Sequence, residues 1–406
     1  MNTLLTADSQ ALKEEFTQFA KNKLAPIASA LLSGKASAQV FWQEMAQASF
    51  LGLNVPTEYG GKNSPFLHLV LLAEILANYD AGLALTFAYH VAAIELIKSY
   101  GSDKQKQFYL PQLANGQLLG SLAYLEFLDS SPNGSKNSSH TKVVSQDNTL
   151  LLSGQKEFVV LADEASANDV TEPQINKNLI LVAVDNEMIV LDDLHQSTIK
   201  IEKQKMPMSF ASVCFARLIF DNHSLMPNSC LGKAPENIEK LSSSAAASNA
   251  QSIALAIGEK LTFARNIVKT LLAATALGMS TTVLNKAIDY SKINQRGDTL
   301  LSQSQAIQWK LADAATETSA ARLLTYRAAW SKDENSDQFF QYATMAKAFA
   351  TRVARIYTSE GLQIILPFLQ NLDSPLTSFY VDSKILETFD APNEEEKVVL
   401  SKLLGI

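Results

Sequence analysis

The chain has 406 residues and a hydrophobic content of 47%, which is enough for two or three packed units. Its formal net charge is −7 and no basic run stands out, so nucleic acid and an anionic membrane surface are poor candidates for a partner. The two cysteines, Cys214 and Cys230, have neither zinc-type spacing nor a histidine cluster around them. We therefore expect reduced thiols, no metal site and a cytoplasmic location.

Targeting and membrane-spanning segments are not expected either. The N-terminal stretch MNTLLTADSQALKEEF lacks a basic segment followed by an apolar one, so no signal peptide is predicted. The most apolar long stretch, residues 253–284, is interrupted by Glu259, Lys260, Arg265 and Lys269. These charges argue against a membrane span.

The first part of the chain, residues 1–120, predicts an N-terminal helical domain. Amphipathic patterns cover residues 11–30 and 36–50. Ser64 and Pro65 stand in the order of an N-cap and a first helical residue, which predicts that the next helix begins there.

The period of the hydrophobic pattern changes near residue 120, and residues 121–235 predict a central antiparallel β-domain. Short β-branched and aromatic runs are bounded by Gly, Asn and Asp. Ser, Asn, Gly and charged residues dominate 129–148, which predicts a mobile loop, and 240–251 predicts a solvated connection. The expected strands lie near 150–160, 178–185, 188–193 and 213–221.

The last part, residues 236–406, predicts a C-terminal four-helix-type bundle. Its helices are expected at 252–290, 302–331 and 337–366, with a final pair within 378–406. The helix after Gln303 carries a stripe of small residues, which allows a neighbouring helix to approach closely and favours a position inside the bundle. The stripe consists of Ile307, Leu311, Ala314, Ala315, Thr318, Ala321, Leu324 and Ala328.

Residue patterns alone say little about chemistry. No nucleophile motif, metal-spaced cluster or phosphate-binding glycine loop is visible, and none of the five histidines lies in a catalytic context. On these grounds the chain is an α+β protein, mostly α-helical, of open function.

The wording of the helical segments, however, resembles the acyl-CoA dehydrogenase family. The helix at 303–330 matches the family's signature helix, with Tyr290 and Gln305 at the family's tyrosine and glutamine. The N-terminal block matches densely, at Pro56, Tyr59, Gly60, Gly61, Glu74, Asp80, Gly101, Gln105, Leu110, Pro111, Gly116 and Gly120.

The resemblance covers nearly the whole chain and implies a helical, a β and a helical domain. It also implies an FAD whose flavin lies against the β-domain and whose diphosphate and adenosine reach a neighbouring subunit. In the family a carboxylate removes the α-proton of an acyl-CoA. Five motifs serve this chemistry, and all five are altered here.

Two altered motifs belong to the flavin side. In the family's Thr-Glu-Pro-x-x-Gly-Ser-Asp loop only Glu126 and Ser131 are retained, and the threonine is Leu125, which has no hydrogen-bond donor. On the following strand Phe158 keeps an aromatic residue, whereas Val160 replaces a threonine hydroxyl.

Two more altered motifs belong to the diphosphate and adenosine side. The family arginine is Asn294, and a shift of two residues would bring Arg296 to its place. Gln363 is retained in the family's Gln-x-x-Gly-Gly-x-Gly turn, but Leu366 and Pro367 replace glycines that allow close backbone approach.

The family's catalytic glutamate falls on Asp390, counted from Asp382 in the family's Arg-Asp pair, whose arginine is Val381. Aspartate is a carboxylate but is one methylene shorter, and a misplacement of ~1 Å can cost on the order of a hundredfold in rate. Asp390 is therefore either the base or a helix-capping or loop aspartate. The position that carries the base in other family members is Val268.

Five changes around one ligand favour a degenerate family member that has no FAD and acts as a binding or interaction protein, with an acyl-CoA or acyl-type ligand possible. The alternative is an active, divergent FAD-dependent acyl-CoA dehydrogenase. A third hypothesis is a subunit that shares cofactor sites with an active paralogue. The apolar bundle and the run at 364–369 predict a homo-oligomer.

Overall fold

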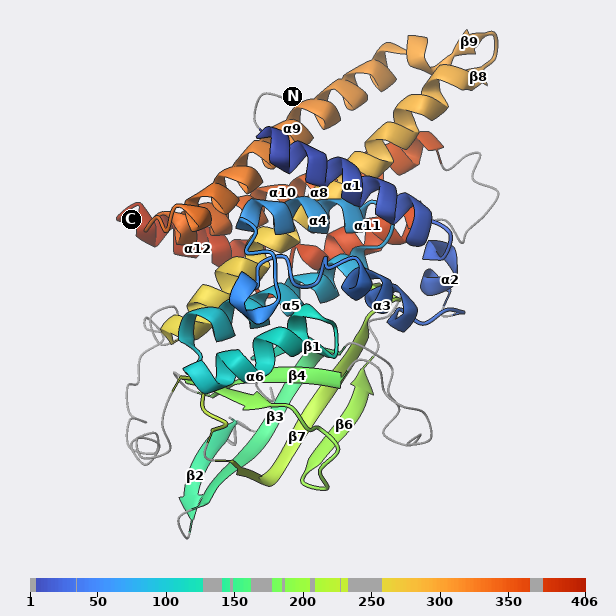
Figure 1. Cartoon of the computed structure of the whole chain (residues 1–406). Coiled ribbons are helices and arrows are strands. Elements are labelled where there is room, and N and C mark those ends of the chain that lie inside the picture. Colours follow the sequence, from blue (N-terminus) through green and yellow to red (C-terminus); the bar gives the residue numbers. More distant parts are fainter. Residues whose placement is uncertain are drawn as a thin grey trace.

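A computed structural model of the chain describes residues 5–33, 35–126, 141–146, 149–161, 177–184, 187–204, 209–226, 228–232, 258–365 and 375–406. In Figure 1 the N-terminal helices lie between a β-region and the C-terminal helices. The mostly α-helical α+β fold expected from the sequence is confirmed. The three-part division stays a proposal, and the first strand, β1 (Leu118–Ala123), runs across its first boundary at residue 120.

The N-terminal part of the chain is helical. Thr6 and Ser102 cap the first and last of its helices through their side-chain oxygens, which satisfies main-chain N–H groups that have no partner within the helix. The helices are α1 (Ala7–Lys23), α2 (Ala28–Leu32), α3 (Gln39–Gln47), α4 (Phe66–Ala77), α5 (Ala81–Tyr100) and α6 (Asp103–Ala114).

The start of α4 differs from the predicted Ser64 cap. The helix begins at Phe66 with Pro65 at the cap position and no side-chain hydrogen bond from its own cap residue. Instead, the Asp333 carboxylate accepts hydrogen bonds from the main-chain N–H groups of Phe66 (2.7 Å) and Leu67 (3.2 Å). A residue far along the chain therefore caps this helix, which a local pattern cannot reveal.

Two sheets make up the β-region among the described residues. The four-stranded sheet is antiparallel, in the order β2 (Lys142–Gln146), β3 (Thr149–Leu161), β7 (Cys214–Leu225) and β6 (Ile199–Gln204). The three-stranded sheet has the order β1, β4 (Lys177–Val184) and β5 (Glu187–Leu191), and β1 pairs with β4 in parallel. This parallel pair departs from the all-antiparallel expectation because the hairpin of β2 and β3 intervenes between β1 and β4 in the chain.

Part of the predicted loop at 129–148 is a strand. Residues 142–146 pair with β3 in antiparallel register, from Lys142 opposite Ser153 to Gln146 opposite Thr149. This short, polar strand is mostly exposed, and it lacks the hydrophobic alternation by which the other strands were found. The rest of that loop and the connection at 240–251 lie outside the described residues.

The C-terminal bundle is built around α8 (Glu259–Ile293), which packs against α4, α5, α9 and α10. Gly278 lets α8 approach α4, since a Cβ atom there would lie 2.3 Å from the main-chain oxygen of Glu74. The other bundle helices are α9 (Gln305–Asp333), α10 (Phe339–Ile365), α11 (Pro375–Leu386) and α12 (Asn393–Leu403). A small hairpin of β8 (Gln295–Arg296) and β9 (Thr299–Leu300) joins α8 to α9.

The predicted long helix is α9, and it is buried along one face only. Ala314, Thr318, Ala321 and Ala328 of the stripe are buried, as expected, whereas Ala315 is exposed. Trp309, on the other face, is 63% exposed. In the single chain α9 is thus an outer helix of the bundle.

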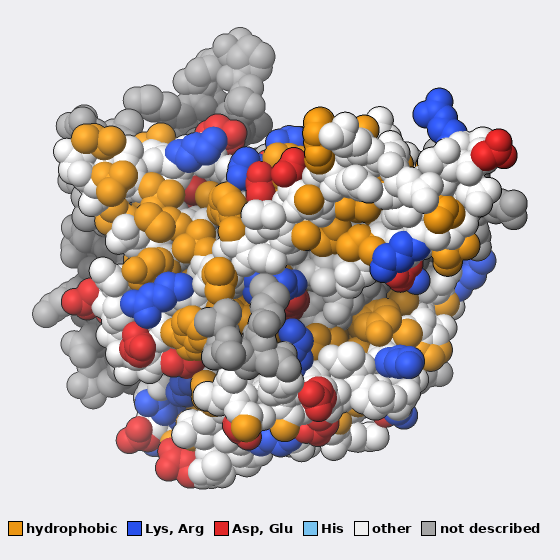
Figure 2. All heavy atoms as spheres, turned by 90° about the horizontal axis from the view of Figure 1, so that it is seen from above, with side chains coloured by type: hydrophobic (Ala, Val, Ile, Leu, Met, Phe, Trp, Pro, Cys, Tyr) orange, Lys and Arg blue, Asp and Glu red, His pale blue; other side chains and the backbone are white. Residues whose placement is uncertain are grey.

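Two helices, α5 and α8, are long and apolar enough to cross a membrane by length and composition. Their most apolar windows are 94% and 89% buried inside the fold, as expected for core helices of a folded domain. Seen from above, hydrophobic side chains form patches between scattered acidic and basic residues (Figure 2).

Asp382 on α11 joins the bundle to the connection between β6 and β7. Its carboxylate accepts hydrogen bonds from the Ser209 hydroxyl (2.9 Å) and the Phe210 main-chain N–H (2.7 Å). Burial raises the pKa of Asp382 to about 7, against the lowering effect of these hydrogen bonds, and nearby Asp80 raises it further. Val381 occupies the place where the family's motif has an arginine.

The raised pKa predicts a pH-dependent loss of stability. The folded chain holds a proton on Asp382 that the unfolded chain releases near pH ~4, so the free energy of unfolding falls as pH rises from about 4 to about 7. Asp382→Asn should be more stable than the parent at pH ~8, on the order of 2 kcal/mol, and should lose this advantage at pH ~4. Urea unfolding at both pH values tests this, with exposed Asp221→Asn as the control. An equal difference at both pH values would contradict it.

Candidate active site

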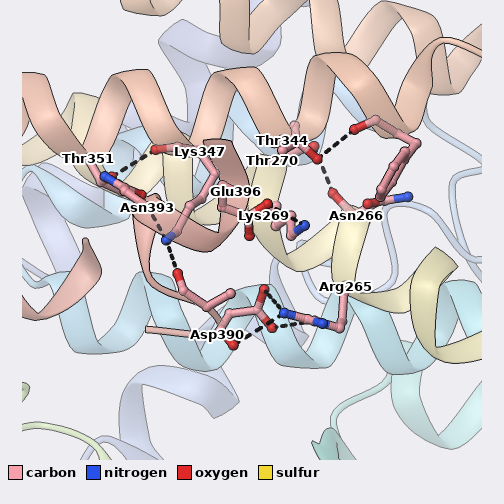
Figure 3. A network of polar contacts seen from close by, with 12 residues as sticks. Arg265, Asn266, Lys269, Thr270, Thr344, Lys347, Thr351, Asp390, Asn393 and Glu396 are labelled. Atoms are coloured by element: carbon pink, nitrogen blue, oxygen red, sulfur yellow. Dashed lines mark hydrogen bonds and ion pairs between the residues drawn. The ribbon is translucent and has the colours of Figure 1, made fainter. Parts of the chain in front are cut away.

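Asp390 lies between α11 and α12 and faces Arg265 of α8 (Figure 3). Tyr124, directly after β1, contacts it from another side. The Asp390 side chain is fully buried, and its φ of 66° is in the left-handed region, which aspartate tolerates better than most residues. The carboxylate at the family's base position is thus a fixed, inward-facing group.

Arg265 of α8 and Tyr124 at the end of β1 hold this carboxylate. The Arg265 Nε donates to Oδ1 of Asp390 at 3.0 Å, and Nη2 donates to both Oδ2 and the main-chain oxygen at 3.3 Å. The Tyr124 hydroxyl donates to Oδ1 at 2.6 Å. Burial would raise the pKa of Asp390, but Arg265, Lys269 and the two hydrogen-bonded side chains outweigh it and lower the pKa. Asp390 is therefore ionised at neutral pH.

Aromatic rings close the site toward the β-region. The Phe389 ring lies 6.4 Å from Tyr89, 6.2 Å from Phe210 and 6.1 Å from Phe215, measured between centroids. All four side chains are buried. The surroundings of Asp390 are therefore dry, which strengthens its interaction with Arg265.

A second set of polar groups lies behind Asp390 in the bundle. Lys347 of α10 contacts the segment that carries Asp390, and Lys269 of α8 forms an ion pair with Glu396 of α12 at 2.8 Å. Both lysines are buried. Figure 3 shows these groups converging from α8, α10 and the start of α12.

The positions expected on the flavin side lie in the β-region, directly after β1 and on β3. The main-chain oxygen of Leu125 accepts from the Glu157 N–H at 2.9 Å, and Glu126 forms an ion pair with Lys156. Phe158 has a φ of 49° and a partly exposed ring that contacts the Phe215 ring. Val160 is buried.

The positions expected on the diphosphate side lie elsewhere. Asn294 ends α8, where both its main-chain N–H and its side-chain amide donate to the main-chain oxygen of Tyr290. Gln363 is exposed, and its Oε1 accepts from the Lys310 ammonium at 2.7 Å. Asn294 lies ~40 Å along α8 from Arg265 at a rise of ~1.5 Å per residue, so the structure separates these positions from Asp390. Ser131, Leu366 and Pro367 fall outside the described residues.

Some described residues at these positions have side chains of a kind that can bind parts of an FAD. The partly exposed Phe158 ring suits a planar aromatic group. Arg296 of the exposed hairpin and Lys310 beside Gln363 carry the positive charge that Asn294, in place of the family's arginine, lacks. The hydroxyl groups expected at positions 125 and 160 are absent.

Sequence reasoning missed the residues that hold Asp390. Arg265 and Lys269 entered the sequence analysis only as charges that interrupt an apolar stretch. Their spacing of one helical turn in a buried helix was a signal, because buried charges need partners. Nothing in the sequence identified Tyr124 or Lys347 as the neighbours of Asp390.

Comparisons with known proteins agree with this arrangement. The model described as "Acyl-CoA dehydrogenase, N-terminal domain" matches residues 6–117, and "Acyl-CoA dehydrogenase, C-terminal domain" matches residues 261–401. The acryloyl-CoA reductase (NADH) of Anaerotignum propionicum is 27% identical over 99% of this chain and 95% of its own length. An acyl-CoA dehydrogenase of Bacillus subtilis is 25% identical over 98% of both chains.

Solved structures are similar over the whole length. A chain from the work "Electron transferring flavoprotein of Acidaminococcus fermentans: Towards a mechanism of flavin-based electron bifurcation" has a TM-score of 0.81 and 26% identity, covering 100% of this chain and 99% of its own. The butyryl-CoA dehydrogenase of Megasphaera elsdenii has a TM-score of 0.81 and 23% identity, covering 99% of both chains, which supports the fold.

Proposed function

Because the chain belongs to the acyl-CoA dehydrogenase family, we propose that it is an FAD-dependent oxidoreductase acting on the CH–CH bond of an acyl-CoA. The observation that carries the proposal is Asp390: a buried, ionised carboxylate at the position where the family has its base. An ionised carboxylate can accept a proton without first losing one.

Our expectation that the chain has no FAD is contradicted by the comparisons and is wrong. The relatives include acyl-CoA dehydrogenases, and one similar solved chain comes from a flavin-based system, which points to FAD. The expectation counted each lost hydroxyl or arginine as lost binding. A planar ring can also be held by packing, and a diphosphate can be held by a cation from another position.

In this proposal Asp390 accepts the proton that leaves the α-carbon of the acyl thioester. When bound, FAD supplies the acceptor for the hydride that leaves the β-carbon, so a Cα–Cβ double bond forms. Arg265 keeps Asp390 ionised at a place where burial alone would favour the protonated acid. Tyr124 fixes one carboxylate oxygen of Asp390. The ring of Phe389 excludes water on the side that faces the β-region.

A second candidate function keeps the ligand but not the reaction. Both oxygens of Asp390 already bind Arg265, and Val268 offers no replacement base at the other family position. A carboxylate with a lowered pKa is also a weaker proton acceptor. These observations favour a family member that binds acyl-CoA without oxidising it.

Assembly into a homo-oligomer is part of the proposal. Phe158 lies on β3 of the β-region, whereas Asn294 lies at the C-terminal end of α8 and Gln363 near the C-terminal end of α10. A cofactor that contacts both sets would take the second set from another copy. The exposed Ile293 (77%) and Trp309 (63%) near the C-terminal end of α8 also favour association. A monomer by light scattering at micromolar concentration would contradict this.

A cytoplasmic location also stays part of the proposal.

Anaerobic titration of the FAD-loaded protein with a panel of saturated acyl-CoA thioesters tests the function. At least one thioester should remove the visible absorbance of oxidised flavin, whereas CoA alone should not, because CoA has no Cα–Cβ bond to oxidise. Calorimetry on the same samples measures binding. Binding without loss of absorbance for every thioester would reject the dehydrogenase and favour the second candidate.

A further inference from the structure

Lys347 binds the segment 387–393, which carries Asp390, at three points. Its side chain is 0% exposed, and its Nζ donates to the main-chain oxygens of Glu387 (3.1 Å) and Ala391 and to Oδ1 of Asn393 (3.0 Å). These bonds use all three protons of an ammonium group. We propose that Lys347 is a positioning residue for Asp390: its side-chain nitrogen fixes the segment, and the segment fixes the carboxylate.

The geometry of the segment shows why it needs such a donor. Residues 387–393 form a tight connection from α11 to α12, closed by a hydrogen bond from the Asn393 N–H to the Glu387 oxygen at 3.0 Å. Asp390, in the middle, adopts a positive φ that most residues avoid. Inward-facing carbonyl oxygens in such a turn need donors, and Lys347 supplies them on both sides of Asp390.

Asn393, the first residue of α12, makes further hydrogen bonds to α10. The Asn393 side-chain amide also donates to the Thr351 hydroxyl at 3.0 Å and to the Ala348 main-chain oxygen at 3.3 Å. Lys347 and Thr351 lie one helical turn apart on α10, so both contact Asn393 from the same face of this helix. Figure 3 shows Lys347 reaching from α10 past Asn393 toward the segment of Asp390.

The charges around Lys347 make this contact sensitive to protons. Burial lowers the pKa of Lys347 to about 8, with Asp390 and Glu396 raising it and Lys269 and Arg265 of α8 lowering it.

Other charged groups of the packed elements point elsewhere. Glu387 pairs with Arg355 and Lys384, and Glu317 of α9 pairs with Arg352. The proton on Lys347 therefore responds to the buried cluster rather than to these surface pairs.

The sign of the pH effect follows from this shift. If the segment detaches, Lys347 meets water and returns toward its ordinary pKa of ~10.4, so opening takes up a proton above pH ~8. Alkaline pH therefore suppresses opening of the segment, because closure then no longer buries a charge and the neutral amine still has two N–H donors.

Hydrogen–deuterium exchange of peptides that cover 387–393 tests the proposal. Lys347→Met removes a donor from three oxygens, of which the Glu387 oxygen and Oδ1 of Asn393 keep another. The segment should therefore exchange on the order of tenfold faster than in the parent, while the core of α8 stays protected. Lys384→Met removes an exposed lysine that pairs with Glu387, and it should exchange as the parent does. Equal exchange in Lys347→Met and the parent, or uniform loosening of the whole bundle, would overturn the proposal.

The parent protein provides a second test that needs no variant. After correction for the intrinsic rate, exchange of the segment should slow as pH rises from about 8 to about 10, because the charge on Lys347 opposes closure, and no change or faster exchange would reject the placement of the Lys347 nitrogen against this segment. The catalytic importance of Lys347 rests on the proposed function, whereas the exchange measurement does not. If Lys347→Met speeds exchange of the segment as expected but the protein oxidises no acyl-CoA, only the proposed function is rejected.

Discussion

Replacing Arg265 with methionine is expected to lower the free energy of unfolding by about 3–5 kcal/mol, the cost of removing one partner of a buried ion pair. Methionine keeps much of the volume and removes the cation. The Asp390 carboxylate, 0% exposed, would then retain Tyr124 as its hydrogen-bond donor but lose the charge that pays for its burial. Urea unfolding of the parent and the variant at neutral pH measures the difference.

The pH dependence and a double variant identify the cause. The folded pKa of Asp390 is lowered, so the ion pair stabilises the protein above the unfolded pKa of ~3.9, and this contribution is lost as pH falls through the folded pKa. The difference between parent and Arg265→Met should therefore shrink in acid. Adding Asp390→Asn to Arg265→Met should restore part of the stability, because no buried charge is then left alone. A double variant no more stable than Arg265→Met would assign the loss to packing.

The fold was predictable where the hydrophobic pattern is strong and local. The helices α8, α9 and α10 follow from apolar residues at helical spacing, and β3, β4 and β7 follow from β-branched and aromatic runs. The failures share one physical cause, which is that the deciding partner is distant in sequence. Asp333 caps α4 from the end of α9, and β2 is a strand because β3 pairs with it.

In the candidate site, likewise, Asp390 was predictable from the sequence and its partner was not. Asp390 was found because its distance along the chain from Asp382 follows the family pattern. Its partner Arg265 stands 125 residues earlier, and only the folded chain brings the two together. The wrong expectation about FAD has a related cause, since the Lys310 ammonium beside Gln363 is visible only in the folded chain.

Replacing Asp390 with asparagine is expected to lower the rate of acyl-CoA oxidation by on the order of 10²–10⁴ while leaving bound FAD in place. An amide has nearly the shape of the carboxylate but cannot accept the α-proton. Asparagine also tolerates the positive φ of 66° at this position, so the change itself does not strain the backbone, although Arg265 loses its ion-pair partner. The Tyr124 hydroxyl can still donate to the amide oxygen. The rate of flavin reduction by a saturated acyl-CoA is the measurement.

The control for this variant is Asp221→Asn, which makes the same change at an exposed aspartate of β7. Neither Asp390 nor the residues described as holding it contact Asp221 through a hydrogen bond, so this variant should reduce flavin at the parent's rate. Calorimetry should find acyl-CoA binding unchanged in Asp390→Asn, because the lost interaction belongs to the proton transfer and not to the ground state. Parent-like oxidation by Asp390→Asn would show that another group takes the proton and that Asp390, with Arg265, serves only to hold the C-terminal segment against α8.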